Sequence, residues 1–131
     1  TKVTDLEPLR KLVKLRSLGL KRLPVTDLSV ISELPALETL NLDFLDVGDL
    51  SMISGASKLK RLTLWGAKVQ DLSALKGLPL TNLDILHTTL PDLSPLASIK
   101  TLKGLNIVGT KPPEETIDAL KKALPDLYIS R

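Results

Sequence analysis

The chain repeats one short arrangement of leucines separated by mostly polar residues. Leu37, Leu40 and Leu42 are spaced as Leu-x-x-Leu-x-Leu, and the same spacing recurs before and after this point, with isoleucine in the last position of two copies. The last two apolar residues alternate with a polar or small residue, as in a strand that buries one face. The copies span residues 15–20, 37–42, 59–64, 80–85 and 102–107. We therefore expect five similar strands.

The copies follow one another at an almost constant interval. A second line, Val-x-Asp in the first four units and Leu-Pro-Asp in the fifth, precedes each helical stretch, and its aspartates lie 22 residues apart until the last interval, which is 21. These aspartates are Asp5, Asp27, Asp49, Asp71 and Asp92. A fixed period of this length is typical of a solenoid, in which each unit buries its apolar face against its neighbours. The pattern predicts repeats at 1–24, 25–46, 47–68, 69–89 and 90–111.

Between the strands, apolar residues recur every third position. In the second unit they are Leu28, Ile31, Leu34 and Leu37. This spacing is typical of a short helical or 3₁₀ segment. Each repeat is therefore expected to be a strand followed by a tight helical return, which makes an α/β chain with a parallel sheet.

The end of the chain leaves the repeat. Pro112 and Pro113 precede two glutamates, a composition that favours a helix start. An apolar stripe at helical spacing follows, and residues 127–129 then resume the strand pattern. We expect residues 112–131 to form a C-terminal cap that consists of a helix and a sixth strand.

The segment 69–75, with the sequence VQDLSAL, and its equivalents resemble one known family. The pattern is similar to the 22-residue leucine-rich repeat of internalins and other bacterial surface or effector proteins. The resemblance covers essentially the whole chain. It implies a solenoid with a short parallel β-sheet on the concave face and 3₁₀ or short helical returns on the convex face.

The sequence departs from that family at one position of the repeat. The family usually has an asparagine three residues beyond Leu-x-Leu, and this chain has other residues there: Leu23, Leu45, Ala67, Thr88 and Thr110. A ladder of asparagine side chains between successive turns is therefore not expected.

The first residues show no counterpart of the C-terminal cap. Thr1 and Lys2 enter the pattern in the middle of a unit, and a solenoid end without a polar cap exposes apolar side chains. We expect the chain to be the C-terminal part of a longer protein and otherwise monomeric.

The composition argues against several classes of function. The 131 residues carry a net charge of +3, which is too small an excess to argue for nucleic acid. There is no cysteine, and no apolar run is long enough to insert into a membrane. No metal-ligand cluster, phosphate-binding loop or nucleophile–base pair is recognisable, so we expect no cofactor, no metal, no catalytic residue and no enzymatic activity.

The aspartates of the Val-x-Asp line have two interpretations. Five stacked carboxylates could bind calcium. An aspartate just before a helical turn is more often a cap that accepts backbone N–H groups. We favour capping.

The candidate binding residues lie just beyond the strands, on the expected concave face. There the sequence places the only Trp, the only Phe and the only His. The predicted partner-binding residues are Asp43, Phe44, Arg61, Trp65, Leu86 and His87. We expect Phe44 and His87 to flank Gly66, which would leave a notch in an apolar patch. Exposed aromatics are typical of interface hot spots, although Trp65 and Phe44 could instead plug gaps in the core.

Three functions fit this pattern. The favoured one is a non-catalytic module that binds another protein on its concave face. The alternatives are the substrate-selecting repeats of a larger bacterial effector enzyme and an architectural spacer without a ligand. The resemblance favours a secreted, cell-surface or host-delivered bacterial protein over a cytoplasmic one.

Overall fold

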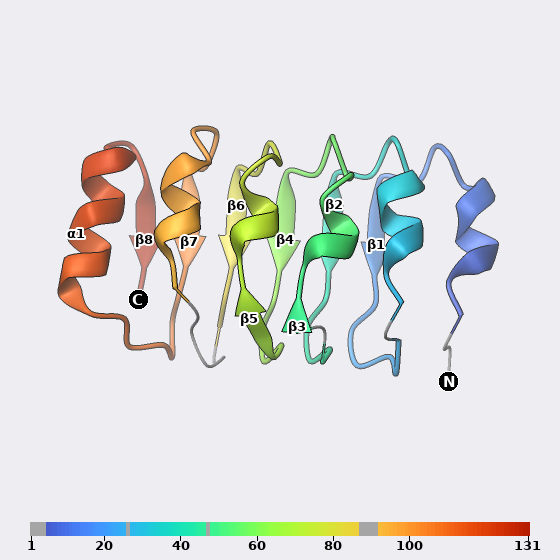
Figure 1. Ribbon diagram of the computed structural model, residues 1–131, viewed down its shortest axis with the longest axis horizontal. Coiled ribbons are helices and arrows are strands. Elements are labelled where there is room, and N and C mark those ends of the chain that lie inside the picture. The colour runs from blue at the N-terminus through green and yellow to red at the C-terminus, as the bar shows by residue number, and fades with distance from the viewer. Residues whose placement is uncertain (1–4, 26, 47, 87–91) are drawn as a thin grey trace.

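The computed structural model contains one sheet of six parallel strands, which is the predicted number (Figure 1). It describes residues 5–25, 27–46, 48–86 and 92–131, with backbone alone at 48, 49 and 70. The strands follow one another across the sheet in the order β1-β2-β4-β6-β7-β8. Their bounds are β1 Ser17–Gly19, β2 Thr39–Asn41, β4 Arg61–Thr63, β6 Asn82–Asp84, β7 Gly104–Asn106 and β8 Tyr128–Ser130.

The register of the sheet stacks equivalent residues of successive repeats. Leu18 pairs with Leu40, Leu40 with Leu62, and the same column continues through Leu83, Leu105 and Ile129. These middle residues point into the core, and Leu40 and Leu62 are fully buried. The residues on either side of them point outward because side chains alternate along a strand. The leucine spacing therefore specifies both the core and the outer face of the sheet.

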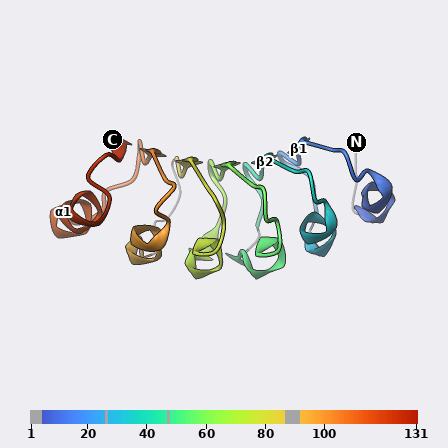
Figure 2. The same cartoon turned by 90° about the horizontal axis from the view of Figure 1, so that it is seen from above.

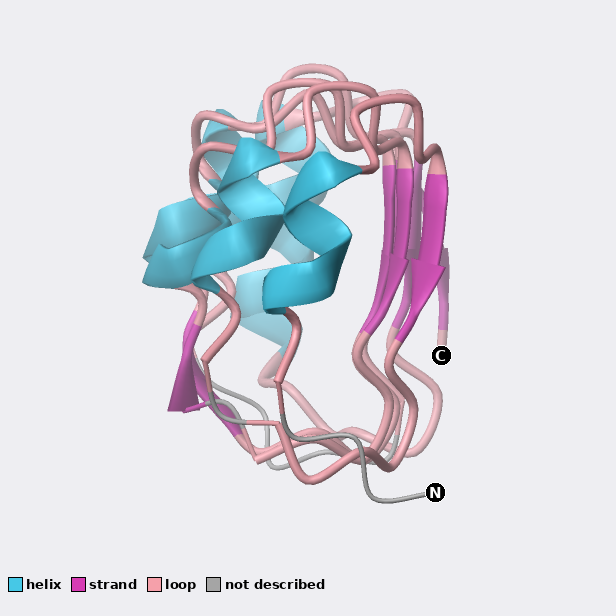
Figure 3. Cartoon of the chain, turned by 90° about the vertical axis from the view of Figure 1, so that its right-hand side faces the viewer, coloured by secondary structure: helices cyan, strands magenta, loops and turns pink. Residues whose placement is uncertain are grey.

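The opposite wall of the solenoid consists of short helices, as predicted. Within the described ranges, the 3₁₀ helices are η1 Glu7–Lys11, η2 Ser29–Glu33, η3 Ser51–Ile53, η4 Ser73–Leu75 and η5 Ser94–Ser98. Figure 3 shows these helices facing the sheet across the core. Seen from above, the helices follow the outside of a shallow arc and the strands follow its inside (Figure 2). The six-stranded sheet is therefore the concave face.

The C-terminal cap is also confirmed. After Pro113, helix α1 runs from Glu114 to Ala123, and strand β8 then pairs with β7. Ile117 and Leu120 on α1 are each 1% exposed. The helix thus covers the last layer of the core with one apolar side and leaves its charged side to solvent.

A second sheet was not predicted. Strands β3 Gly48–Asp49 and β5 Val69–Asp71 pair in parallel on the helical side of the solenoid (Figure 3). The register shifts between Gly48 and Asp49, so the longer strand has one extra residue. We had interpreted the Val-x-Asp line only as the approach to a helix. Because neighbouring repeats place two such extended lines side by side, their backbones can also pair.

The aspartates cap the helical turns in every copy whose side chain is described. Asp27 Oδ1 accepts a hydrogen bond from the Ser29 backbone N–H at 3.0 Å. Asp5, Asp71 and Asp92 accept the equivalent bond from the residue two positions on. The capping interpretation is confirmed, with the aspartate one residue before the leucine that precedes each helix.

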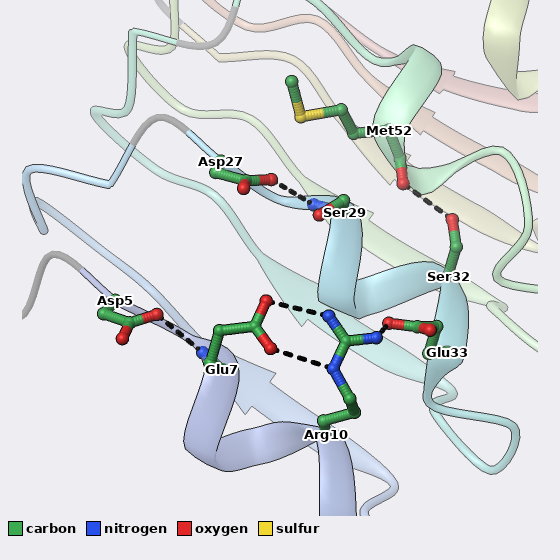
Figure 4. A network of polar contacts seen from close by, with 8 residues as sticks. All are labelled: Asp5, Glu7, Arg10, Asp27, Ser29, Ser32, Glu33 and Met52. Atoms are coloured by element: carbon green, nitrogen blue, oxygen red, sulfur yellow. Dashed lines mark hydrogen bonds and ion pairs between the residues drawn. The ribbon is translucent and has the colours of Figure 1, made fainter.

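A polar network links the first two helices on the convex face (Figure 4). Arg10 donates to both carboxylate oxygens of Glu7, at 2.9 and 2.8 Å, and also forms an ion pair with Glu33 of η2. In the next layer, the Ser32 hydroxyl donates to the Met52 carbonyl oxygen at 2.6 Å. Surface pairs of this kind contribute little individually, but they connect successive turns outside the core.

Backbone hydrogen bonds close the turns in which the family asparagine is replaced. The N–H groups of Leu23, Leu45 and Ala67 donate to the carbonyl oxygens three residues earlier, at 3.1 to 3.2 Å. The Thr110 hydroxyl reaches the Ile107 carbonyl oxygen at 2.6 Å, which is a bond within one turn. These turns therefore need no side-chain ladder between repeats.

Burial is weaker in the first layer than in those behind it. Leu15 and Leu18 are partly buried, whereas the equivalent Leu37 and Leu40 are fully buried. The N-terminal side of this layer has no described neighbour to pack against. Within the described residues, no helix is long and apolar enough to cross a membrane.

Replacing a leucine in the middle of the stack should cost more than replacing its equivalent at the end. Leu62→Ala removes a fully buried side chain between two layers and is expected to lower the free energy of unfolding by about 2–5 kcal/mol. Leu18→Ala, at a partly buried position, should cost clearly less. Urea unfolding of both variants measures the difference, and equal losses would contradict the layered packing.

Candidate functional site

The candidate site lies beyond the carboxyl ends of β1, β2 and β4, at the edge to which the arrowheads of the concave sheet point in Figure 3. Backbone hydrogen bonds between repeats continue past the strands into this region. The Phe44 N–H donates to the Trp65 carbonyl oxygen at 2.8 Å, and the Arg22 N–H donates to the Asp43 carbonyl oxygen at 3.0 Å. The residues after the strands are thus held in register by the backbone.

One column in this region has left-handed backbone conformation. Arg22, Phe44, Gly66 and Gly109 are equivalent residues and have φ values of 60°, 62°, 65° and 85°. Such values are unfavourable for residues with a Cβ. In these four turns the conformation is therefore the same whether or not the residue has a side chain, and at Phe44 it directs the side chain across the surface toward the next repeat.

Phe44, Trp65 and Gly66 form the centre of the site. The Phe44 and Trp65 ring centroids are 5.5 Å apart with the planes tilted by 43°, within the range in which aromatic pairs attract each other. A Cβ on Gly66 would lie 2.7 Å from Cδ1 and Cε1 of Phe44. The Phe44 ring therefore packs directly against the Gly66 backbone and occupies the space where we expected a notch.

Both rings are at the surface. Phe44 is 37% exposed and Trp65 is 39% exposed, whereas the core leucines beneath them, Leu42 and Leu64, are fully buried. The alternative in which these aromatics plug the core is therefore wrong. We call Phe44 and Trp65 the aromatic pair.

Two cations of the first repeat stack on the aromatic pair. Lys21 Nζ lies 5.7 Å from the Phe44 ring centroid and 5.5 Å from that of Trp65. Arg22 Cζ lies 4.6 Å from the Phe44 centroid. Both cations are within the distance at which a ring face attracts a cation. Neither cation is among the predicted site residues, although Lys21 stands in the column of Trp65, two repeats earlier, and Arg22 in the column of Phe44, one repeat earlier.

The other predicted site residues lie in different environments. Asp43 is 6% exposed, and its Oδ1 accepts a hydrogen bond from the Trp65 N–H at 2.9 Å. It therefore positions the Trp65 backbone and offers a partner little surface. Arg61 is exposed on β4, Leu86 is half-buried, and His87 lies outside the described residues.

Polar side chains form the floor of the concave face beside this pair. The outward column of the strands contains Asn41, Thr63, Asp84 and Asn106. Asn41 Oδ1 accepts the Asp43 N–H at 2.9 Å, whereas Thr63 Oγ1 is buried and has no hydrogen-bond partner in the structure. The floor thus contains Asn41, which holds a turn, and Thr63, whose hydroxyl oxygen is enclosed.

Asp84 is the titratable group of this floor with a raised pKa. Burial raises the pKa of Asp84 and the negative charge of Asp43 adds to the rise, while Arg61 opposes it. Elsewhere on the concave face, a hydrogen bond from Arg16 lowers the pKa of Glu38. The charged form of the Asp84 side chain is therefore disfavoured, whereas that of Glu38 is stabilised by Arg16.

A metal site requires several His, Cys, Asp or Glu side chains close together, and the described residues do not meet this requirement. Within the described part of the chain, no three His, Asp or Glu residues are grouped closely enough to hold a metal ion. What the arrangement offers is an exposed aromatic surface with cations on one side and hydrogen-bonding groups on the other.

No protein-family model and no curated protein matches the sequence. Solved structures do match. An internalin of Listeria monocytogenes, InlF, has a TM-score of 0.82 and 27% identity over 98% of this chain and 38% of its own. Internalin C2 of the same organism has a TM-score of 0.81 and 30% identity over 98% of this chain and 56% of its own.

A third similar structure is a leucine-rich repeat protein of Leptospira interrogans. Its TM-score is 0.76 with 23% identity, over 99% of this chain and 35% of its own. That likeness concerns the fold alone. All three are longer, and the chain spans about a third to somewhat over half of their lengths.

The contact between Phe44 and Gly66 can be tested by adding one methyl group. Gly66→Ala places a Cβ against the Phe44 ring in a left-handed conformation and is expected to cost about 1–3 kcal/mol of stability. Fluorescence of Trp65, the only tryptophan, should change as Phe44 moves. The matched control is Gly77→Ala, whose Cβ would meet no atom within 4 Å. Equal stability of the two variants would contradict the packing.

The raised pKa of Asp84 predicts a pH-dependent stability. A carboxyl whose pKa is raised on folding favours the folded state below its ordinary value of 3.8, and this contribution is lost as pH rises through the raised pKa. Asp84→Asn should therefore be more stable than wild type at pH 7 and equal to it at about pH 3. Thermal melting across this pH range measures the effect.

Asp92→Asn is the control of opposite sign. Hydrogen bonds from the Ser94 side chain and backbone lower the pKa of Asp92, so its carboxylate stabilises the fold at neutral pH and this contribution is lost as pH falls through the lowered pKa. Asp92→Asn should destabilise at pH 7. If both variants shift stability in the same direction at pH 7, the assignment for Asp84 is wrong.

Proposed function

The chain is a leucine-rich repeat protein with an internalin-like fold, and from this premise we propose that it binds another protein on its concave face. The module works reversibly and without catalysis by its own residues. The similar structures are bacterial, and the proposal includes a place for the protein at the cell surface or outside the cell.

The observation that carries the proposal is the exposure of the aromatic pair. Phe44 and Trp65 expose more than a third of their surface although neither is needed to fill the core. Large aromatics held in one position at a surface are enriched among residues that dominate binding energy. The pair is held by Gly66 from below and by the Asp43 hydrogen bond to the Trp65 backbone.

The surface around the pair supports the same function. Leu86 and Val108 follow Trp65 in its column, and Val108 is 40% exposed. Successive strands are about 4.8 Å apart, so these residues extend the apolar surface toward the C-terminal cap. The polar floor lies next to this stripe and can hydrogen-bond to a ligand. An apolar centre with polar surroundings is the usual anatomy of a protein interface.

Substitution of Trp65 tests the proposal. Wild type, Trp65→Ala and the control Tyr128→Ala are immobilised and exposed to extracellular proteins and cell-surface extracts, and the proteins retained are identified by mass spectrometry. Tyr128 is a suitable control because it is 72% exposed on β8, at the far end of the same face. A specific partner should be retained by wild type and Tyr128→Ala and lost from Trp65→Ala.

The affinity of the purified partner then gives the magnitude. A hot-spot aromatic contributes at least 2 kcal/mol, so Trp65→Ala should raise the Kd about thirtyfold or more. The melting temperature of the variant should stay close to wild type because the ring is exposed. A partner that binds Trp65→Ala with wild-type affinity would contradict the proposed binding face.

A further inference from the structure

The cations at the aromatic pair contact rings, whereas the described ion pairs of the chain join other cations to carboxylates. Arg10, Arg16, Lys68 and Arg131 each form an ion pair with a carboxylate. Lys21 and Arg22 contact the aromatic rings instead, and among the residues that the structure describes neither forms an ion pair. Lys21 and Arg22 therefore place positive charge at the site, and no carboxylate of the described residues forms an ion pair with either of them.

The aromatic rings also restrict where these cations lie. Lys21 is within 6 Å of both ring centroids, and Arg22 stacks on Phe44. A cation held in place before binding loses less conformational entropy when it meets a ligand. Lys21 and Arg22 are thus already positioned next to the exposed apolar surface of Trp65.

Little acidic side-chain surface is exposed at the aromatic pair. The Asp43 side chain is buried against the Trp65 backbone. Burial also disfavours the charged form of Asp84, an acidic group of the floor. An incoming carboxylate can therefore reach Lys21 and Arg22 without meeting the Asp43 side chain at the surface.

We propose that the partner presents an acidic segment with a neighbouring apolar residue. Its carboxylates bind Lys21 and Arg22, and its apolar side chain lies on Trp65 and Leu86. This inference rests on the proposed function, because it specifies what the concave face binds. Charge complementarity of this kind accelerates association and selects among partners.

A single-stranded nucleic acid is the other anionic ligand to consider. Proteins that bind it offer free aromatic faces on which bases stack. Here Lys21 and Arg22 already lie over faces of the aromatic pair. The concave face also carries the acidic side chain of Glu38, which would repel a phosphate backbone. The geometry favours a carboxylate-bearing peptide over a nucleic acid.

The test uses a displayed library of random 16-residue peptides selected against the 131-residue chain. Peptides that bind wild type and not Trp65→Ala should be enriched in Asp or Glu within a few positions of Leu, Ile, Val or Phe. One such peptide is then synthesised, together with a version in which Asn and Gln replace its acidic residues. The second version should bind at least about tenfold more weakly.

Matched variants of the protein test the same contact from the other side. Lys21→Gln with Arg22→Gln should weaken binding of the acidic peptide about tenfold, with a larger effect at low salt. The control is Lys121→Gln with Lys122→Gln, which removes the same charge from the exposed side of α1 and should leave the affinity within about twofold. Circular dichroism and melting temperature confirm that both double variants are folded.

Three outcomes would overturn the inference, and they are distinguishable. Trp65-dependent peptides without acidic residues, bound equally by the Lys21 and Arg22 double variant, would refute the acidic partner and leave the proposed function intact. Competition by a 16-nucleotide oligothymidine would favour nucleic acid instead. A library that gives no Trp65-dependent binder would contradict the proposed function and this inference together.

Discussion

Each repeat of this protein can bury its leucines only against the neighbouring repeats. Leu40 and Leu62 are fully buried because a layer lies on either side of each, whereas the equivalent Leu18 in the first layer is partly buried. The parallel register converts this requirement into geometry, since Leu18, Leu40 and Leu62 must stand in one column. Each outward-facing residue of a strand therefore lies next to the equivalent residues of the neighbouring repeats, and the concave face consists of columns of such residues.

The described turns after the strands place equivalent residues of successive repeats side by side at the site as well. The left-handed residue of these turns is a glycine at Gly66 and Gly109 and a residue with a side chain at Arg22 and Phe44. Where a side chain is present, the turn directs it over the next repeat. The Phe44 ring can pack closely against its neighbour because that neighbour is Gly66, which has no Cβ. The aromatic pair therefore depends on two equivalent positions: the left-handed conformation of Phe44 in one repeat and the missing side chain of Gly66 in the next.

Much of the fold could be predicted from spacing, and less of the site. The period of 22 residues and the Leu-x-Leu line were enough for six parallel strands, the helical returns and the cap, because backbone register follows from which residues are buried. The side chains of Asp43 and Phe44 could not be placed in this way. Their positions depend on the φ of the turn and on which atoms the neighbouring repeat leaves free. The pairing of β3 with β5 likewise depends on backbone groups, which the side-chain pattern does not encode.

The cations show why reading down the columns is needed to find such a site. Along the chain, Lys21 and Arg22 are two of the several Lys and Arg residues of the first repeat, and nothing in that local sequence distinguishes them. One repeat adds a translation of about 4.8 Å, so a long side chain readily reaches rings that come 22 or 44 residues later. The site therefore belongs to no single repeat. Its contacts join side chains of the first three repeats, because Lys21 and Arg22 of the first lie over Phe44 of the second and Lys21 also lies over Trp65 of the third.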